Sequence, residues 1–344
     1  MQRRERIFWG AIVVLALAYP WLVELAGAMK LMTVPVYQRL GALVLLAAIG
    51  ASAWNIVGGY AGQVSVGHAI FFGVGAYSAV LGYHYLGLPP ILGVPLGMIV
   101  SVAIAATIGV PTLKLSGHYF SMATIAVAEL VRVLVPTFDE LGGAQGLSGP
   151  TLPRTVLDLS FTSAMPYYYL FLAVLAGILY VTWRIEGSRM GFYLRAIKDS
   201  ERAARSLGVE AGRYKLYAYM LSAAMTALAG GLYLTMIGFI DPESGFGILI
   251  SVKMLIMAAL GGAGLLFGPL VGALILVPLE EISNSLLGGK GAGLTFVVYG
   301  AIIIIIARFL PSGLLALVKP ARETPATAVV TAAKPAPAGG THAA

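Results

Sequence analysis

Long apolar runs separated by short polar breaks dominate the chain of 344 residues. A run of about 20 apolar residues is long enough to cross the hydrocarbon layer of a bilayer as a helix. The pattern therefore predicts an all-α, polytopic integral membrane protein with about ten transmembrane helices, at residues 7–28, 36–57, 64–86, 91–113, 119–136, 166–183, 216–240, 248–260, 265–287 and 294–310. The eighth run is short and contains Lys253, so we expect a half-helix or a re-entrant segment packed against protein.

Composition indicates the same class of protein. Hydrophobic residues make up 59% of the chain and charged residues 11%, whereas a soluble globular domain has about 25% charged residues. There is no cysteine, which excludes disulfides, thiolate catalysis and cysteine-ligated metal sites. The net charge of +7 is better explained by basic cytoplasmic loops than by nucleic-acid binding, because the chain offers no soluble basic domain.

The distribution of Lys and Arg predicts an orientation. If the basic N-terminus is on the cytoplasmic side, ten crossings place a polar insert and the C-terminus on the same side. This insert carries eight Lys or Arg against four Asp or Glu. We expect a first transmembrane helix with a cytoplasmic N-terminus, an N-terminal bundle part, the insert, a C-terminal bundle part and a disordered cytoplasmic tail, at residues 1–28, 29–183, 184–215, 216–318 and 319–344. A cleavable signal peptide is the alternative interpretation of the first run.

Within the insert, the segment GFYLRAIKDSERAARSLG mixes apolar, small and basic residues. It predicts an amphipathic helix of about four turns that ends at Gly208, where glycine can adopt the left-handed conformation. Such a helix can lie on a lipid surface, connect two spans passively, or dock into a groove of a soluble partner. The paired alanines and the acidic Asp199 and Glu201 favour docking, since a lipid-binding face usually carries bulkier apolar residues.

The longer stretch SRMGFYLRAIKDSERAARSLGVEAGRYKLYAYMLSAAMTALAGGLYL resembles the cytoplasmic coupling loop and the following span of branched-chain amino acid ABC importer permeases, most of all their LivM-like subunit. Three further stretches resemble the same family: NIVGGYAGQVSVGHAIFFGVGAYSA from Asn55, GHYFSMATIAVAEL from Gly117, and MAALGGAGLLFGPLVGALIL from Met257. The resemblance covers the chain from about residue 53 to residue 310. It implies an ABC importer permease-type bundle in the cytoplasmic (inner) membrane of a bacterium or archaeon, with both termini cytoplasmic.

The resemblance also implies a mechanism and partners. In such importers a short cytoplasmic helix of the permease sits in a cleft of the ATPase subunit and moves when the ATPase pair closes around ATP. The chain would then be a transport subunit and no enzyme, without a cofactor of its own, and partner chains would bind ATP and magnesium. The implied partners are a second permease subunit in a heterodimer, two ATP-binding subunits, an extracytoplasmic solute-binding protein and the lipid bilayer.

By match to the family's loop, contact with the ATPase is expected at Gly191, Arg195, Ala196, Glu201, Ala203, Ala204 and Gly208. The small residues would allow close approach of the partner. Arg195 and Glu201 are candidates for pairing across that interface, or for a solvated contact within the helix.

The stretch GGYAGQVSVGHAIFFGVGAYSAVLGYHYLG is unusually rich in glycine for a span. Glycine beside polar residues indicates an interrupted helix or tight packing, and broken helices are tolerated only inside protein or facing a water-filled cavity. The polar residues there are therefore candidates for lining the translocation pathway: Asn55, Gln63, Ser65 and His68. The alternative is that these side chains bond to neighbouring helices and that His68 is a satisfied packing residue.

Other charges and motifs carry no enzyme chemistry. Glu129 and Arg132 are three residues apart and are expected to form a structural ion pair, with a gating role as the minority alternative. In SLLGGKGAG, Lys290 is followed by Gly291 where a phosphate-binding loop requires Ser or Thr, so ATP hydrolysis must come from another polypeptide. The four histidines are scattered and give no metal-ligand cluster.

The sequence is compatible with three functions. The leading one is a permease subunit of an ATP-driven importer for branched-chain, hydrophobic amino acids, whose alternating access is driven through the coupling helix. A permease for urea or short amides would have a similar loop. An ion-coupled secondary transporter would require intramembrane carboxylates and inverted repeats. Glu129 is nearly the only internal acid before Glu280 and Glu281 near a span end, and no convincing repeat is present.

Overall fold

The computed structural model describes residues 3–30, 33–115, 117–149 and 156–286, and isolated positions between 297 and 315. The tenth predicted span lies largely, and the tail at 319–344 wholly, outside the described residues. The described helices are α1 (Arg3–Ala28), α2 (Val34–Asn55), α3 (Ala69–Leu86), α4 (Pro90–Thr112), α5 (His118–Leu134), α6 (Ala164–Glu186), α7 (Arg189–Asp199), α8 (Glu201–Ser206), α9 (Ala211–Ile237), α10 (Pro242–Phe246), α11 (Ile248–Gly261) and α12 (Gly268–Leu286).

Short elements complete the fold. A π-helical turn (Ile56–Tyr60) continues α2, and three 3₁₀ turns lie at Val135–Thr137, Asp139–Leu141 and Val156–Asp158. Two strands of two residues, β1 (Leu147–Ser148) and β2 (Phe239–Ile240), pair antiparallel with Leu147 opposite Ile240. Neither the strand pair nor the π-turn is predicted by the apolar pattern, because both depend on contacts between distant segments.

Among the described residues, seven helical segments are long and apolar enough to cross a membrane: Val34–Tyr60, Ala69–Leu86, Pro90–Thr112, His118–Thr137, Ala164–Glu186, Ala211–Ile237 and Pro242–Gly261. In addition, α1 contributes a shorter apolar segment, Val14–Ala28, and α12 corresponds to the ninth predicted run. The prediction of a polytopic, all-α membrane protein is confirmed. These segments do not establish the predicted number of about ten spans.

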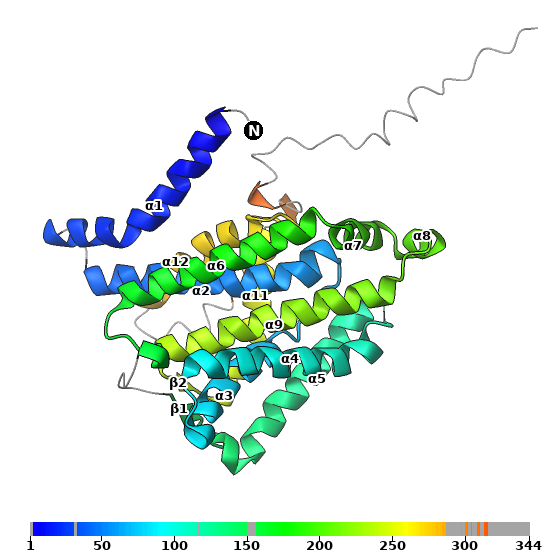
Figure 1. The fold of residues 1–344 in the computed structure, drawn as a ribbon, viewed down its shortest axis with the longest axis horizontal. Helices are drawn as coiled ribbons and strands as arrows, with labels where there is room; N and C mark the ends of the chain where they lie inside the picture. Colours follow the sequence, from blue (N-terminus) through cyan, green and yellow to red (C-terminus); the bar gives the residue numbers. More distant parts are fainter. Residues whose placement is uncertain are drawn as a thin grey trace, which may run out of the picture.

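α2 lies at the centre of the bundle (Figure 1). It packs against α6, α9, α11 and α12, while α3, α4 and α9 pack against one another. The apolar segment that contains α2 is 83% buried, against 28% for α4 and 22% for the segment that contains α5. α2 is therefore a core helix, and α4 and α5 present most of their surface to the surroundings of the chain.

Small residues set the spacing between the helices of the core. Gly75 of α3 lies against the carbonyl oxygen of Ala227, and Gly230 of α9 lies against the carbonyl oxygen of Phe72, so that a Cβ at either glycine would overlap backbone. Close approach of this kind lets membrane helices associate by van der Waals packing. The glycines of these spans thus serve packing, which the sequence offers as one of two explanations.

The eighth predicted run, residues 248–260, forms the short helix α11. The five-residue α10 precedes the fourteen-residue α11, and the two together make the apolar segment Pro242–Gly261. The side chain of Lys253 in α11 is paired with Glu280 in α12, Nζ to Oε1 at 2.5 Å. The short helix with its charge is therefore accommodated because the cation is paired within the protein, as expected for intramembrane charges.

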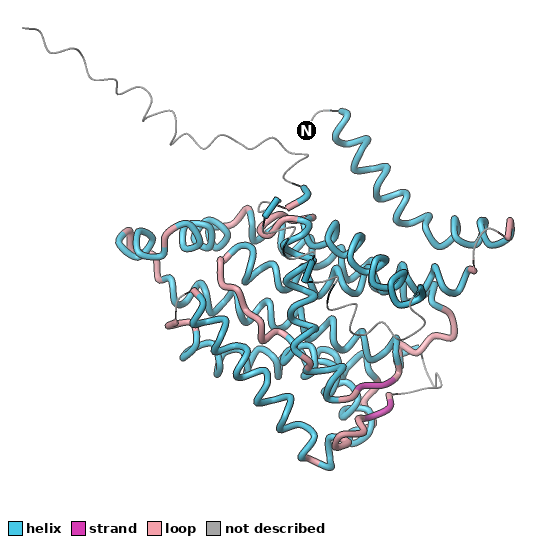
Figure 2. Tube along the Cα trace, turned by 180° about the vertical axis from the view of Figure 1, so that it is seen from behind, coloured by secondary structure: helices cyan, strands magenta, loops and turns pink. Residues whose placement is uncertain are grey.

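The first helix stands apart from the bundle over its N-terminal half, as Figures 1 and 2 both show. Pro20 lies inside α1 and interrupts its hydrogen bonding, which explains a bend. Tyrosines contribute to the contacts of α1 with the bundle: the hydroxyl groups of Tyr168 and Tyr169 donate to the carbonyl oxygens of Ala16 and Leu17, at 2.8 and 3.1 Å.

The bundle has two distinct ends. α7 and α8 lie at one end, which we call the insert end, and β1 and β2 lie at the other, which we call the far end (Figure 1). α10 follows β2 directly in the chain and belongs to the far end. Long-range contacts at the far end join the loop after α5 to α3, since the hydroxyl of Tyr85 donates to the carbonyl oxygen of Glu140 at 3.1 Å. α9 runs from the insert end to the far end and connects the two.

Candidate functional site

The insert forms two helices and not the single amphipathic helix that the sequence predicts. α7 ends at Asp199, and Ser200 has an extended backbone with φ −159° and ψ 103°. The side-chain oxygen of Ser200 accepts a hydrogen bond from the amide of Ala203 at 3.3 Å and so caps α8. The prediction of one continuous helix was wrong because Ser is a strong N-cap residue, which competes with helix continuation.

The predicted end of the insert helix is confirmed. α8 ends at Ser206, and Gly208 has φ +84°, a left-handed conformation that glycine adopts without steric cost. The preceding residue, Leu207, is 86% exposed, which is unusual for a large apolar side chain. A hydrophobic side chain at the tip of the insert is a candidate for contact with another chain.

The inner face of the insert is packed against the bundle. Leu194 is fully buried, and Ile197 packs with Ala204 and Ala211 in a small cluster under the helices. Gly191 is buried as well, and a Cβ at this position would overlap the carbonyl oxygen of Ile185 at the end of α6. The insert is therefore a fixed part of the fold on this side.

A buried ion pair joins the insert to α9. Lys215 has a side chain only 1% exposed, and its Nζ lies 2.5 Å from Oε2 of Glu201. The other carboxylate oxygen of Glu201 accepts from Arg205 at 2.6 Å along α8. Because Lys215 is shielded from water, Glu201 is its counter-charge, and loss of the carboxylate would leave a buried cation unpaired.

The seven residues expected to contact an ATPase separate into two groups. Gly191 and Ala204 are buried against the bundle, and Glu201 is partly buried in its ion pair. Arg195, Ala203 and Gly208 are exposed, and Ala196 is partly exposed. Arg195 donates to the carbonyl oxygen of Glu186 at 2.9 Å, so Arg195 and Glu201 have different partners and do not pair with each other. The exposed group is the one available for contact with another chain.

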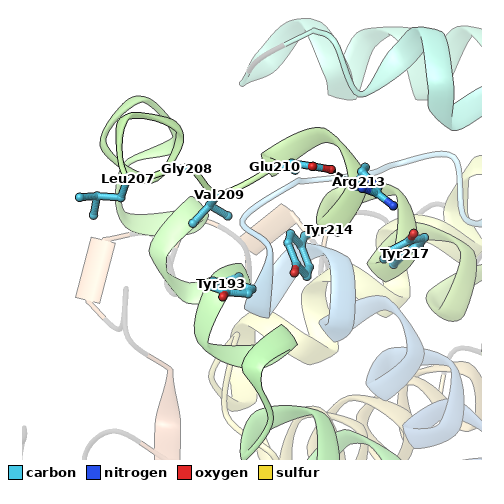
Figure 3. A pocket seen from close by; sticks show the side chains of 8 residues that line it. All are labelled: Tyr193, Leu207, Gly208, Val209, Glu210, Arg213, Tyr214 and Tyr217. Atoms are coloured by element: carbon cyan, nitrogen blue, oxygen red, sulfur yellow. Dashed lines mark hydrogen bonds and ion pairs between the residues drawn. The ribbon is translucent and has the colours of Figure 1, made fainter.

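A groove of about 310 Å³ lies between the end of α8 and the start of α9 (Figure 3). Its lining includes Leu207, Gly208 and three tyrosines, of which Tyr193 and Tyr214 have ring centroids 4.8 Å apart. Arg213 and Glu210 form its polar side and are paired at 2.6 Å. The sequence pattern does not predict this groove, because its tyrosines belong to α7 and α9 and meet only in the folded chain.

Two glycine-containing turns meet at the insert end. Asn55, which is 1% exposed, donates from Nδ2 to the carbonyl oxygen of Leu265 at 3.1 Å and accepts at Oδ1 from the amide of Gly264 at 2.8 Å. The Nζ of Lys198 in α7 donates to the carbonyl oxygen of Gly59 at 2.7 Å. The contact of Lys198 is not predicted by the sequence. A basic residue in the insert gives no signal of its own, and the π-turn that supplies its partner is not predicted by the apolar pattern.

His68 and Ser65, two candidates for the translocation pathway, lie fully buried in a polar network. The hydroxyl of Ser222 donates to the carbonyl oxygen of Ala53 at 2.6 Å. Because its single hydrogen is used there, the Ser222 oxygen accepts a hydrogen bond from the Nε2–H of His68 at 2.8 Å. The Nδ1 of His68 then accepts from the hydroxyl of Ser65 at 2.9 Å. In this state of the chain the network is satisfied internally and ties α2, α3 and α9 together.

The fourth pathway candidate differs from the others. Gln63 is half-buried, and within the part of the chain that the structure describes its Oε1 makes no hydrogen bond. Hydrogen bonds within the chain involve the side chains of Asn55, Ser65 and His68. Among the described residues, the Gln63 Oε1 has no such partner. Among the four predicted residues, the structure joins Ser65 and His68 in one hydrogen-bond network, and the role of the four in a pathway stays a prediction.

The expected pair of Glu129 and Arg132 is confirmed at the far end. Arg132 donates through Nε and Nη2 to the two carboxylate oxygens of Glu129, at 2.9 and 2.5 Å, and through Nη1 to Glu243 of α10 at 2.9 Å. The bidentate geometry is the favoured arrangement of Arg with a carboxylate. This cluster fixes α5 to α10, which is a structural role.

Residues 37–307 of the chain match the protein family described as branched-chain amino acid transport system / permease component. The high-affinity branched-chain amino acid transport system permease protein LivM of Salmonella typhimurium is 28% identical over 341 residues, which cover 92% of this chain and 76% of LivM. LivM of Escherichia coli is also 28% identical, with the same coverage. LivH of Salmonella typhimurium, a permease protein of the same transport system, is 31% identical over 158 residues, which cover 46% of this chain and 48% of LivH.

The family match covers most of the chain and includes the segments from which the helical bundle, the glycine-containing turns and the insert are built. The relatives are permeases, in agreement with the apolar helices of the fold. The chain belongs to the branched-chain amino acid transport system permease family and is a multi-pass membrane protein of the ABC transporter permease type.

Proposed function

We propose that this chain is the transmembrane subunit of an ATP-driven importer for branched-chain, hydrophobic amino acids, and that ATPase subunits drive it through α7 and α8. The observation that carries the proposal is the two-sided insert. Its inner face is fixed to the bundle by Leu194, Gly191 and the ion pair of Glu201 with Lys215, and its outer face exposes Arg195, Ala203 and Leu207. A lever needs both a rigid attachment and a free surface.

The proposed mechanism is a shift between two states of the bundle. ATPase subunits that close around ATP and magnesium displace α7 and α8, and the attachment to α9 carries the displacement into the membrane. The free energy comes from the difference in affinity of the ATPases for the two states, which is the requirement for any ligand-driven change. The insert is on the cytoplasmic side in this proposal, as are both termini, in accord with its excess of Lys and Arg.

The proposed assembly has further chains. The family includes two permease types, LivM and LivH, named for one kind of transport system, which supports a heterodimer of permeases here. Two ATP-binding subunits and an extracytoplasmic solute-binding protein complete the importer, in the cytoplasmic membrane of a bacterium or archaeon. Branched-chain amino acids are the proposed cargo because the named function of LivM and LivH is their transport.

Reconstitution tests the proposal directly. The chain, its partner permease, the two ATPase chains and the binding protein are placed in liposomes, and uptake of leucine, isoleucine, valine, urea and acetamide is measured with ATP. We expect ATP-dependent uptake of the three amino acids and no hydrolysis by this chain alone. Uptake of urea or acetamide in their place would correct the cargo, and concentrative uptake by this chain without ATPases would overturn the mechanism.

Substitution of the exposed face tests the lever. Ala203→Trp places a bulky side chain on the outer side of α8, where Ala203 is exposed, so the bundle should fold normally. We expect loss of co-purification with the ATPases and at least a tenfold drop in substrate-stimulated hydrolysis. Lys114→Trp, at an exposed position after α4, is the matched control and should retain both. Normal stimulation in Ala203→Trp would contradict docking at α8.

A further inference from the structure

Lys198 connects the insert to the point where two membrane helices end. Its Nζ donates to the carbonyl oxygen of Gly59 at 2.7 Å, in the π-turn that continues α2. Its aliphatic stem lies against Gly62, where a Cβ would stand 2.9 Å from Cγ of Lys198 and where φ is +68°. A Cβ at Gly264, in the turn after α11, would lie 3.3 Å from the same Nζ.

The two turns form one unit. A Cβ at Gly59 would overlap the amide nitrogen of Gly264, so the backbones of the two turns are in direct contact. Asn55, the last residue of α2, bonds through its side-chain amide group to Gly264 and Leu265 and so ties the end of α2 to the turn after α11. A displacement of one turn therefore moves the other, and with it the ends of α2 and α11.

The chemistry of the contact suits a lysine. The last carbonyl groups of a helix lack intrahelical partners and carry the negative end of the helix dipole. A cation that reaches them from another element satisfies one carbonyl and is attracted by the dipole. The four-carbon stem of lysine gives the reach, and the glycines leave the space for it.

We propose that Lys198 is a positioning residue that transmits the movement of α7 to the paired glycine turns and so couples ATP hydrolysis to the opening of the pathway; this inference rests on the proposed function. The ion pair of Glu201 with Lys215 attaches the insert to α9, on the side of α3 and α4. Lys198 attaches it to α2 and α11, on the other side of the core. The insert thereby holds both sides of the bundle at one end.

The test is the ratio of transported leucine to hydrolysed ATP in the full reconstituted complex. Lys198→Met keeps the stem and removes the donor, and we expect ATPase co-purification and hydrolysis within twofold of the unmodified complex, with uptake per ATP reduced at least tenfold. Lys198→Arg restores a donor and should recover a large part of the ratio. Lys114→Met is the control for loss of an exposed lysine and should leave the ratio unchanged.

A second measurement reports on the turn without transport. The chain has no cysteine, so a single Ala61→Cys in the buried turn provides the only thiol. We expect Lys198→Met to raise the rate of maleimide labelling at this thiol at least fivefold, and Lys114→Met to leave it unchanged. Unchanged labelling would mean that Lys198 does not hold the turn.

The outcomes separate the two proposals. If the unmodified complex couples hydrolysis to uptake and Lys198→Met keeps the same ratio, the role of Lys198 is overturned and the proposed function stands. If Lys198→Met loses hydrolysis and uptake in equal proportion together with thermal stability, Lys198 has a structural role only and the inference is again overturned. If the unmodified complex shows neither activity, the proposed function fails, and the transmission role fails with it.

Discussion

The two ends of the bundle both use charged side chains to join distant elements, but they do so in different surroundings. At the insert end, Lys215 is 1% exposed and is paired with the carboxylate of Glu201. At the far end, Arg132 is 34% exposed, and its partners Glu129 and Glu243 are 47% and 70% exposed. Similar short distances therefore describe two kinds of contact.

The difference in burial indicates which of the two contacts costs more free energy to break. Removing one partner of a buried ion pair costs about 3–5 kcal/mol, because the other charge stays desolvated, whereas exposed pairs contribute about 0–1 kcal/mol. The insert end is then the rigid connection and the far end the tolerant one. A permease driven from the insert needs this order, since force must enter the bundle through a contact that does not yield.

The largest expected effect is that of Glu201→Gln. The change keeps the shape of the side chain but leaves the ammonium of Lys215 without a counter-charge in a buried position. We expect a loss of about 3 kcal/mol in stability, with loss of ATP-coupled uptake. Thermal unfolding of the purified chain in detergent measures the first and vesicle uptake the second.

Two controls sharpen this experiment. Glu201→Gln with Lys215→Met replaces the ion pair by a neutral pair and should recover most of the stability, since no buried charge is then left alone. Arg205 is the exposed partner of Glu201, and its side chain is 60% exposed. Arg205→Ala removes this exposed contact only and should change stability little. An equal loss in Arg205→Ala and Glu201→Gln would remove the distinction between buried and exposed contacts on which the comparison depends.

The next effect in size is that of Gly191→Ala. A Cβ at this position overlaps the carbonyl oxygen of Ile185, so α7 must shift away from the end of α6. Overpacking of this kind costs about 1–3 kcal/mol. We expect reduced stability and weaker stimulation of the ATPase. Gly187→Ala is the matched control, because the nearest atom to a Cβ at this position is 3.8 Å away. A similar loss of stability in Gly187→Ala would mean that the alanine itself, and not the overlap with Ile185, is responsible.

Much of the fold follows from the apolar pattern. The apolar pattern predicts spans near α2, α3, α4, α5, α6 and α9, and a half-helix or re-entrant segment at the short eighth run with Lys253. Whether an apolar run forms a membrane-spanning helix depends mainly on its length and hydrophobicity, because the bilayer is its solvent. The order of residues along the chain is therefore enough to predict the spans. The strand pair, the π-turn and the break at Ser200 escaped prediction, because backbone groups from distant segments and a local capping bond decide them.

The site was predicted less completely. The similarity of the coupling loop to a known family pointed to the insert as a whole, but not to the orientation of its residues. Gly191 and Ala204 face the bundle while Arg195 and Ala203 face outward, which depends on the angle at which α7 and α8 lie. The contact of Lys198 with Gly59 joins residues 139 positions apart, and periodicity carries no information on such a pair.

A smaller effect is expected from Ser200→Ala at the break between α7 and α8. The substitution removes the side-chain acceptor for the amide of Ala203 and should destabilise α8 locally by about 1 kcal/mol. Amide hydrogen exchange over residues 201–206 measures this, and faster exchange by about fivefold is expected there. Ser200→Asp keeps an acceptor and Ser206→Ala removes a hydroxyl outside the cap, so both should leave these rates near their original values.

The smallest effect is expected from Arg132→Ala at the far end. Glu129 and Glu243 remain exposed and can be hydrated when the guanidinium is removed, so we expect at most about 1 kcal/mol of lost stability, and less at high salt, where the pair is already screened. Thermal unfolding at low and high ionic strength measures both quantities. A loss as large as that of Glu201→Gln, without dependence on salt, would mean that the far-end cluster is shielded from water in the membrane or by another subunit. The rigidity of the bundle would then be shared by its two ends, and force entering at the insert would meet resistance along the whole length of α9.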